Sequence, residues 1–330
     1  MSQVVKMYCA GGCAANIAKK LEAYRGKESN GFASLDCVYI DTSRSNHDSI
    51  IPEDRIYHIN HDNTDKNVDG SGKKRDTNAA LIQDRVKEIL LQFKPTEFNI
   101  VLHSASGGSG SVIAPTLVSE MLDNDIPVIV IIVGSRDSRI EVNNTINTMK
   151  SYESIARMRD KPVIAAYYEN NTDNSRAATD SDVQNMIAIL SVILSKENKE
   201  LDSSDLKNWL DYTRVTSFPP RLSFLTLFNK EVVMRKGETI ISVCTLVDKN
   251  ASASLELPVE YQTVGFVDET NLERLNLTYP THSAIIGGAF NGLINSLTKR
   301  LEEYDAVRKS INDRQILVGG EKATSSGLIL

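Results

Sequence analysis

Cysteine is scarce in this sequence, and it has no long apolar runs. The 330 residues include four cysteines, at positions 9, 13, 37 and 244, and their spacing fits neither a metal site nor a dense disulfide framework. We therefore expect free thiols and a reducing compartment. No apolar run approaches the ~20 residues that cross a bilayer, and no secretion signal is recognisable at the start. These absences predict a cytoplasmic protein without a membrane partner.

An excess of positive charge is also lacking. The formal net charge is −6 and the sequence pI is about 5.5. Nucleic acids and anionic membranes attract proteins that are rich in lysine and arginine, so direct binding of nucleic acid is not expected. Hydrophobic residues make up 41% of the chain, which is enough to fill the cores of two modest domains.

The first half of the chain alternates between β-rich runs and segments with helical spacing. The β-rich runs are VVKMYCAG, LDCVYIDT, RIYHIN, FNIVLHSA, PVIVIIVG and PVIAAYYE. The segments with helical spacing include NIAKKLEAYRG, NAALIQDRVKEILLQFK, VIAPTLVSEMLDND and INTMKSYESIARMRD. Such alternation predicts an α/β fold with a parallel, Rossmann-like sheet, helices on both faces, and ligands beyond the carboxyl ends of the strands.

The second half has a different character. A strongly apolar stretch, about residues 180–198, predicts a long central helix that is buried on most sides. After it, RLSFLTLFN, TIISVCTLVD and VEYQTVGFVD predict strands, and residues 288–311 predict a helix. We expect these elements to form a second α+β domain. The end, GGEKATSSGLIL, is rich in glycine and serine and predicts a flexible tail with an apolar tip.

The turns that follow the predicted strands are rich in glycine, serine, asparagine and aspartate. Among them are AGGCAAN, DTSRSN, DGSGKKRDTN and SASGGSGS. Backbone N–H groups approach an anion closely only where side chains are small, and the start of a helix adds partial positive charge. The loops at Gly11–Gly12 and Ser106–Ser111 therefore predict a cradle for a polyphosphate, although either loop alone is equally consistent with an ordinary tight turn.

Three familiar motifs fail at these turns. A P-loop would need glycine at Asn67 and a hydroxyl at Lys74, and a dinucleotide fingerprint would need glycine at Cys13. A hydrolase elbow centred on Ser109 has Ser111 in place of its last glycine.

Two loops together resemble the signature of the tubulin/FtsZ superfamily. The segment SASGGSGS, residues 104–111, resembles its glycine-rich loop, and LDSSDLKNW, residues 201–209, resembles its catalytic loop, with Asp202 and Asp205 at the family's three-residue spacing. In detail, AGGCAANIA and VGSRDSRIEVNNTINTMKSYESIA are similar to tubulins of the PhuZ type from large bacteriophages.

The resemblance implies a GTP-dependent filament former that hydrolyses GTP with Mg²⁺ as cofactor. A helix of about 20 residues at 1.5 Å each would place Asp202 and Asp205 about 30 Å from the phosphates of their own subunit. Head-to-tail stacking would then complete the active site on the next subunit. The resemblance further implies a phage spindle that positions phage DNA in the host cytoplasm.

The resemblance also implies a division of the chain. A GTP-binding domain (1–179) would precede a central core helix (180–200), a catalytic loop with a C-terminal activation domain (201–311), and a tail (312–330) that docks on the neighbouring subunit. The apolar residues Leu328, Ile329 and Leu330 would contribute to that docking.

Site residues follow from the resemblance one by one. Asp202 and Asp205 would be catalytic, and no side chain is assigned as a metal ligand. Asn170 and Asn171, after the sixth strand, and Asn185, on the long helix, are candidates for contacting guanine, because an amide both accepts and donates hydrogen bonds. The residues matched to phosphate, ribose or phosphate-bound metal are Gly11, Gly12, Asn16, Asp41, Thr42, Gly70, Ser71, Gly72, Ser106, Gly107, Gly108, Ser109, Gly110, Ser111, Glu141 and Asn144.

Several alternatives stay open. The chain could be a nucleotide-binding scaffold or regulator with incidental hydrolysis, or a small-molecule enzyme that uses the same cleft. The acidic loop could cap the helix that follows, through Ser203, Ser204 or Asp205. Pro115 lies in a helical pattern, so that helix is expected to kink or to begin late.

Overall fold

The structure is a computed structural model of the chain. It describes residues 3–24, 32–44, 50–60, 71–171, 174–195, 200–229, 234–248, 258–267 and 280–312.

The described strands form one ten-stranded sheet in the order β3-β2-β1-β4-β5-β6-β7-β10-β8-β9. All neighbouring strands pair in parallel except the two pairings of β10, which are antiparallel. The strands are β1 (Val4–Ala10), β2 (Ser34–Asp41), β3 (Ile56–His58), β4 (Asn99–Ser104), β5 (Val128–Ser135), β6 (Val163–Asn170), β7 (Leu222–Phe228), β8 (Thr239–Asp248), β9 (Tyr261–Val267) and β10 (Thr281–Gly287).

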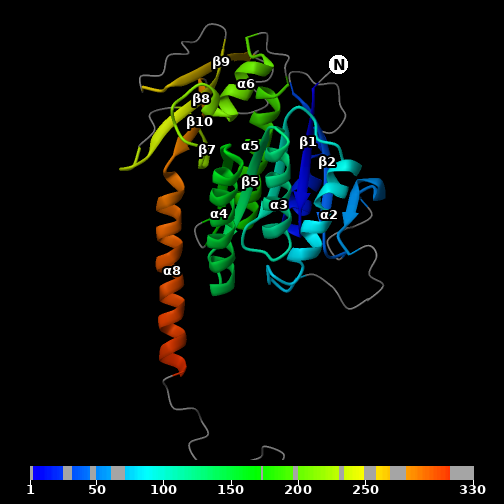
Figure 1. Cartoon of the computed structure of the whole chain (residues 1–330), viewed down its shortest axis with the longest axis vertical. Coiled ribbons are helices and arrows are strands. Elements are labelled where there is room, and N and C mark those ends of the chain that lie inside the picture. The colour runs from blue at the N-terminus through cyan, green and yellow to red at the C-terminus, as the bar shows by residue number, and fades with distance from the viewer. Residues whose placement is uncertain are drawn as a thin grey trace, which may run out of the picture.

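Helices cover both faces of this sheet (Figure 1). Alternate residues of each strand point to opposite faces, so Met7 and Cys9 enter one core, with α1, α5 and α6, and Tyr8 enters the other, with α2, α3 and α4. The helices are α1 (Gly12–Ala18), α2 (Ala79–Gln92), α3 (Gly110–Asp123), α4 (Arg139–Arg159), α5 (Arg176–Ile193), α6 (Ser203–Leu210) and α8 (Ala289–Asn312), and the short 3₁₀ turns are η1 (Lys19–Tyr24), η2 (Glu53–Arg55) and η3 (Tyr212–Arg214).

The strands expected in a second domain continue the same sheet. Residues 163–165 of β6 pair in parallel with residues 222–224 of β7, and β10, β8 and β9 follow. The expected mixture of helices and strands is therefore present, joined to the first part by this short pairing. The boundaries of the four predicted parts remain predictions.

The central helix begins and ends earlier than its sequence predicts. Helix α5 spans Arg176–Ile193, because Ser175 caps its start and accepts a hydrogen bond from the backbone N–H of Ala178. Every residue from Met186 to Ile193 is buried, as the apolar composition predicts. The helix starts at the carboxyl edge of the parallel strands and leads toward α6 at the opposite end of the molecule (Figure 1).

Helix α3 contains a proline, and helix α8 projects from the sheet (Figure 1). Helix α3 starts at Gly110 and includes Pro115, so the expectation of a late start is wrong. Helix α8 packs on α4 through Leu297, which forms a buried cluster with Val142 and Ile146, and then extends past the sheet (Figure 1). No helix of the described residues is long and apolar enough to cross a membrane.

Candidate functional site

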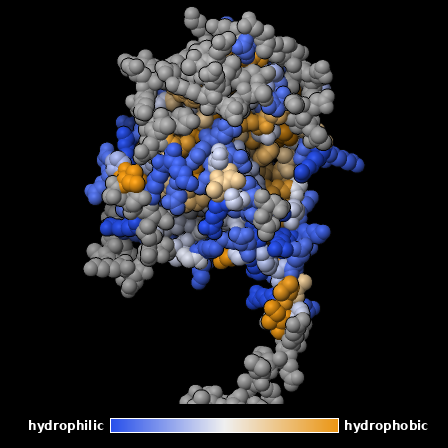
Figure 2. Space-filling model, turned by 180° about the vertical axis from the view of Figure 1, so that it is seen from behind, coloured by the Kyte–Doolittle hydropathy of each residue, from blue (hydrophilic) through white to orange (hydrophobic). Residues whose placement is uncertain are grey.

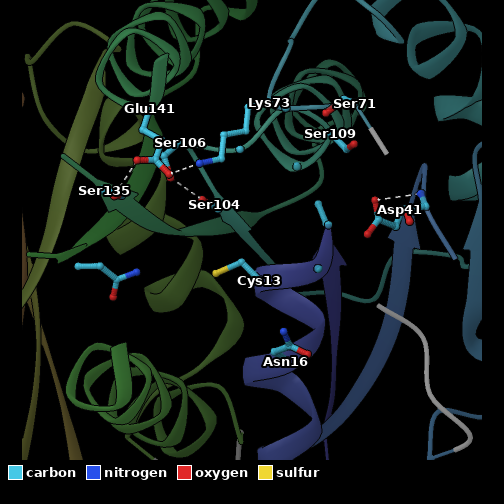
Figure 3. Close-up of a pocket in the computed structure, with 18 of the residues that line it drawn as sticks. Cys13, Asn16, Asp41, Ser71, Lys73, Ser104, Ser106, Ser109, Ser135 and Glu141 are labelled. Atoms are coloured by element: carbon cyan, nitrogen blue, oxygen red, sulfur yellow. Dashed lines mark hydrogen bonds and ion pairs between the residues drawn. The ribbon is translucent and has the colours of Figure 1, made fainter. Parts of the chain in front are cut away.

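A cleft opens where five parallel strands end. Its volume is about 490 Å³, and its lining includes the last residues of β1, β2, β4, β5 and β6, which are Ala10, Asp41, Ser104, Ser135 and Asn170. The loops that follow these strands supply most of the remaining walls (Figure 3). The cleft therefore lies where the α/β pattern predicts a ligand.

The cleft brings together most of the residues predicted from the sequence. Those that line it are Gly11, Gly12, Asn16, Asp41, Ser71, Ser106, Gly107, Gly108, Ser109, Gly110, Glu141 and Asn170. Those that do not line it are Thr42, Gly72, Ser111, Asn144, Asn171 and Asn185. Gly70 lies outside the described residues.

The starts of helices α1 and α3 touch each other through glycine. A side chain at Gly110 would place its Cβ 2.5 Å from the carbonyl oxygen of Ala10, and Gly11 has a φ of +82°. Neither the residue before α1 nor the residue before α3 caps its helix with a side chain, so the N-cap side chains leave the first N–H groups available. Two helix starts thus present backbone donors and partial positive charge to one side of the cleft.

The glycine-rich loop, residues 104–111, is held from behind by two buried side chains. The Asn144 Nδ2 donates to the carbonyl oxygens of Ser106 at 3.1 Å and Gly107 at 3.2 Å. The Ser111 Oγ donates to the carbonyl oxygens of Gly107 at 2.7 Å and Gly108 at 2.9 Å. The side chains of Asn144 and Ser111 therefore support the loop from behind and do not line the cleft.

A second loop packs against the first. A Cβ on Gly108 would lie 1.8 Å from the Ser71 Oγ, so only glycine allows this approach. Asn144 ties the two loops together, because its Nδ2 also donates to the Lys73 carbonyl oxygen at 2.9 Å. Gly72 and Lys73 both have positive φ values, 55° and 65°, and their turn directs the lysine side chain into the cleft.

Asp41 and Thr42 lie on the same side of the cleft as Ser109. The buried Asp41 carboxylate accepts a hydrogen bond from the Thr42 N–H at 2.7 Å through Oδ1. The hydroxyls of Thr42 and Ser109 are 2.5 Å apart. This places one carboxylate and two hydroxyls beside the start of α3, although Thr42 itself is not part of the lining.

Glu141, in the first turn of α4, contacts three polar side chains. Its Oε1 lies 2.7 Å from the Lys73 Nζ, and its Oε2 accepts from Ser138 at 2.9 Å and Ser135 at 3.3 Å. Burial by itself would raise the pKa of this carboxyl, but the hydrogen bonds from Lys73, Ser138 and Ser135 outweigh burial and lower the pKa below its ordinary value. Glu141 is therefore ionised at neutral pH.

Of the three asparagines considered for the base, the structure favours Asn170. Its Oδ1 is buried and has no hydrogen-bond partner among the described residues. Asn171 is exposed and its Oδ1 accepts from the Asn174 N–H at 2.7 Å within a turn. Asn185 is exposed on α5 and lines a different cavity, beside Tyr168.

Sequence reasoning missed several residues of the cleft. Cys13, Lys73, Asp137, Arg176 and Asp180 all contribute to its lining. The spacing of Arg176 and Asp180 on one helix face could have indicated them, had the start of α5 been placed correctly. Burial, followed by the charge of Asp180, raises the pKa of Cys13 to about 12, so its thiol stays protonated and is no nucleophile.

The two predicted catalytic acids lie at the other end of α5. Asp202 is the N-cap of α6, and its Oδ1 accepts from the N–H groups of Ser204 at 2.7 Å and Asp205 at 2.9 Å. Asp205 completes a capping box by accepting from the Asp202 N–H at 3.4 Å. The capping interpretation is confirmed, with Asp202 as the cap and not Ser203, Ser204 or Asp205.

Asp205 also contacts the last part of the sheet. The Tyr261 hydroxyl donates to its Oδ1 at 3.2 Å, and burial together with the Asp205 charge raises the pKa of Tyr261 to about 12. Neither acid lines the cleft of its own subunit. The 18 residues of α5 at 1.5 Å each separate the two regions by about 27 Å.

Comparison with known proteins supports a specific class. No family model matches the chain. A phage tubulin-like protein of Pseudomonas phage phiKZ is 26% identical over 340 residues, covering 100% of this chain and 99% of the relative. Among solved structures, a protofilament of TubZ from bacteriophage PhiKZ has a TM-score of 0.83 at 24% identity, and the phage tubulin PhuZ with GDP has a TM-score of 0.82 at 20% identity. Each covers 99% of both chains.

The continuous sheet, the central helix and the cleft at its start match the tubulin/FtsZ fold of these solved structures. The predicted fold class is confirmed. In sequence the chain is similar to phage tubulin-like proteins along its whole length, in agreement with the resemblance to phage tubulins of the PhuZ type.

Proposed function

We propose that this chain is a cytoskeletal GTPase that assembles head to tail and hydrolyses GTP to GDP and phosphate at the subunit interface. The observation that carries the proposal is the separation of about 27 Å between the cleft and the acids of α6. The acids cannot act on a nucleotide in their own subunit, but stacking would bring them to the cleft of the next one. There Asp202 and Asp205 would orient the attacking water and accept its proton.

The cleft has the features that a guanine nucleotide requires. The starts of α1 and α3 and the glycine-rich loop offer backbone donors for phosphates. The Oδ1 of Asn170, which has no hydrogen-bond partner in the described part of the chain, suits the N–H donors at the edge of guanine. One of the similar solved structures is described as a complex with GDP. We therefore extend GTP and GDP binding to this chain.

The donor groups beside α3 also fit Mg²⁺ bound together with the nucleotide. Mg²⁺ in phosphate sites takes one or two carboxylates and completes its shell with phosphate and water. Asp41 is the carboxylate positioned for this, and the described residues contain no cluster of three acidic, histidine or cysteine ligands that would hold a metal alone. The ion would neutralise charge that develops on the phosphates.

Assembly follows from the placement of the two half-sites. A contact between the α6 end of one subunit and the cleft of another uses different surfaces, so it continues into an open filament. Figure 2 shows hydrophobic residues near the projecting end of α8, where Val307 and Ile311 are each about three-fifths exposed, at 59% and 60%. We propose that this end and the tail that follows dock on a neighbouring subunit. Residues 313–330 lie outside the described part of the chain.

The biological role we propose is a filament in the host cytoplasm that positions phage DNA, without direct contact to nucleic acid or membrane. The support is the similarity to phage tubulin-like proteins and the net charge of −6. In this proposal residues 1–179 bind GTP, 180–200 form the central helix, 201–311 activate hydrolysis, and 312–330 form the docking tail.

The capping role of the two acids leaves room for a second candidate, a nucleotide-binding scaffold or regulator with incidental hydrolysis. Asp202 and Asp205 cap α6, and a protein without catalytic activity would also keep such a cap. The presence of both acids is therefore compatible with either function.

Light scattering and electron microscopy after addition of GTP and Mg²⁺ test the proposal. We expect polymers above a critical protein concentration and phosphate release that rises with polymer mass. Binding of GTP without any polymer across a wide range of protein concentration would favour the scaffold. Phosphate release strictly proportional to protein concentration would contradict hydrolysis at an interface.

A further inference from the structure

The cleft accepts an anion in the proposed function, yet carboxylates outnumber basic side chains in it. Its described lining contains the carboxylates of Asp41, Asp137, Glu141 and Asp180, and the basic side chains of Lys73 and Arg176. The glycine-rich loop has no charged side chain from Ser104 to Ser111. A polyphosphate bound along this loop would therefore depend strongly on any cation within reach.

Lys73 is the lining cation that lies beside the glycine-rich loop. Its side chain extends past Ser106 toward Glu141, with Asn16 on the far side of the cleft (Figure 3). Arg176 lies on another wall of the cleft, at the start of α5. Its charge acts on the Cys13 thiol, as the charge of Asp180 does.

The ion pair between Lys73 and Glu141 can open at low cost. The lysine side chain is 52% exposed, and an ion pair with such access to water is weak. Glu141 would keep its hydrogen bonds from Ser138 and Ser135 on the other carboxylate oxygen. The carboxylate would thus remain solvated by the protein after the lysine leaves.

The backbone of Lys73 is fixed while its side chain is not. Asn144 holds the Lys73 carbonyl oxygen at 2.9 Å, and the Lys74 N–H donates to the Ser71 carbonyl oxygen at 2.9 Å. A change of partner therefore needs only rotation about side-chain bonds, which is fast and leaves both loops in place.

We propose that Lys73 binds the terminal phosphate of a nucleoside triphosphate and exchanges Glu141 for that phosphate when the nucleotide enters. The phosphate loop meets Gly11 at its Gly110 end and Ser71 at Gly108, so Lys73 serves the end of the phosphate chain next to Ser71. With a diphosphate, the lysine stays on Glu141. The inference rests on the proposed nucleotide binding and adds a residue that distinguishes GTP from GDP.

Calorimetric titration of GTP and GDP into four proteins tests this role. These are the wild type, Lys73→Met, which keeps an apolar stem, Lys73→Arg, which keeps the charge, and Lys74→Met, which removes a neighbouring exposed lysine that does not line the cleft. For Lys73→Met we expect GTP affinity to fall about tenfold and GDP affinity to stay within about twofold. Lys73→Arg should retain the preference for GTP, and Lys74→Met should match the wild type. Equal losses for both nucleotides in Lys73→Met would overturn the inference.

Inorganic tripolyphosphate provides a probe that does not depend on guanine. Glu141→Gln should release Lys73 and strengthen tripolyphosphate binding by about threefold, whereas Lys73→Met should weaken it. Unchanged or weaker binding by Glu141→Gln would refute the exchange. A wild type that binds tripolyphosphate through Lys73 but does not bind GTP would refute the proposed function, while the contact of Lys73 with a terminal phosphate would stand. If the wild type binds GTP and Lys73→Met binds it equally well, this inference is refuted and the proposed function stands. Circular dichroism melts confirm that each variant is folded.

Discussion

Replacing Asp202 by asparagine removes a negative charge but keeps the oxygen that caps α6. In the structure a single atom, Oδ1, accepts from both the Ser204 and Asp205 N–H groups. Asparagine is as good an N-cap as aspartate, whereas alanine at such a position costs about 1 kcal/mol. In a protein of this size that loss corresponds to about 2 °C in the melting temperature. Asp202→Asn should therefore melt like the wild type and Asp202→Ala slightly below it.

The two substitutions should behave alike in hydrolysis. Both remove the carboxylate that we propose orients water at the neighbouring subunit, and loss of such a group lowers a rate by about a hundredfold. GTP binding should be unchanged, because Asp202 lies about 27 Å from the cleft of its own subunit. Slower hydrolysis should also make the polymers more persistent. Phosphate release and pelleting above the critical concentration measure both effects.

Ser204→Ala is the matched control, because it removes an exposed hydroxyl from the same helical turn. The backbone N–H of residue 204 can still donate to Asp202. It should hydrolyse GTP at the wild-type rate. Asp205→Asn should slow hydrolysis as Asp202→Asn does. If Asp202→Asn polymerises and hydrolyses GTP normally, the two acids only cap α6, and the catalytic role is refuted.

Three further predictions concern the glycine loop, a buried histidine and the tail. Gly110→Ala should destabilise the protein by about 1–3 kcal/mol in thermal melts, because its Cβ would meet the neighbouring backbone at 2.5 Å, whereas Gly107→Ala, with nothing within 4 Å, should not. Burial lowers the pKa of His103 to about 3. Between pH 6.5 and about pH 3, therefore, this histidine binds a proton in the unfolded chain but not in the folded one. The free energy of unfolding should fall by up to about 1.4 kcal/mol per pH unit below pH 6.5. His103→Gln should remove this part of the slope in urea unfolding at pH 5.5 and 7. Deleting residues 315–330 should leave GTP affinity intact and raise the critical concentration strongly, and unchanged assembly would contradict tail docking.

Local chemistry explains why the cleft could be found in the sequence. The loops at Gly11 and at Ser106–Gly110 follow β-rich runs, which predicts that they lie at the ends of strands. Their small residues bury little apolar surface but let backbone N–H groups approach an anion, so the composition also predicts a phosphate cradle. The strands follow in the same way from runs of valine and isoleucine. Both kinds of signal are contained within about ten consecutive residues.

The neighbouring sequence does not reveal whether a side chain of the site points into the cleft or into the protein. Asn144 and Ser111 have the residue types that bind phosphate, yet both point into the protein and bond to carbonyl oxygens of the loop. Asn185 lies on α5 outside the cleft because that helix starts at Arg176, which Ser175 determines through a single cap. A shift of a few residues along a helix turns a side chain to another face.

The ion pair between Lys73 and Glu141 could not be predicted from the sequence either. The two residues are 68 positions apart, and neither has a neighbour in sequence that indicates the other. They meet because Asn144 joins the loop of Lys73 to the first turns of α4, where Glu141 also lies. An ion pair that can exchange a carboxylate for a phosphate therefore arises from the arrangement of two loops around one buried amide. Removing that amide, rather than either charge, should uncouple the loops: Asn144→Ala should weaken GTP and GDP binding alike, unlike the selective loss expected for Lys73→Met.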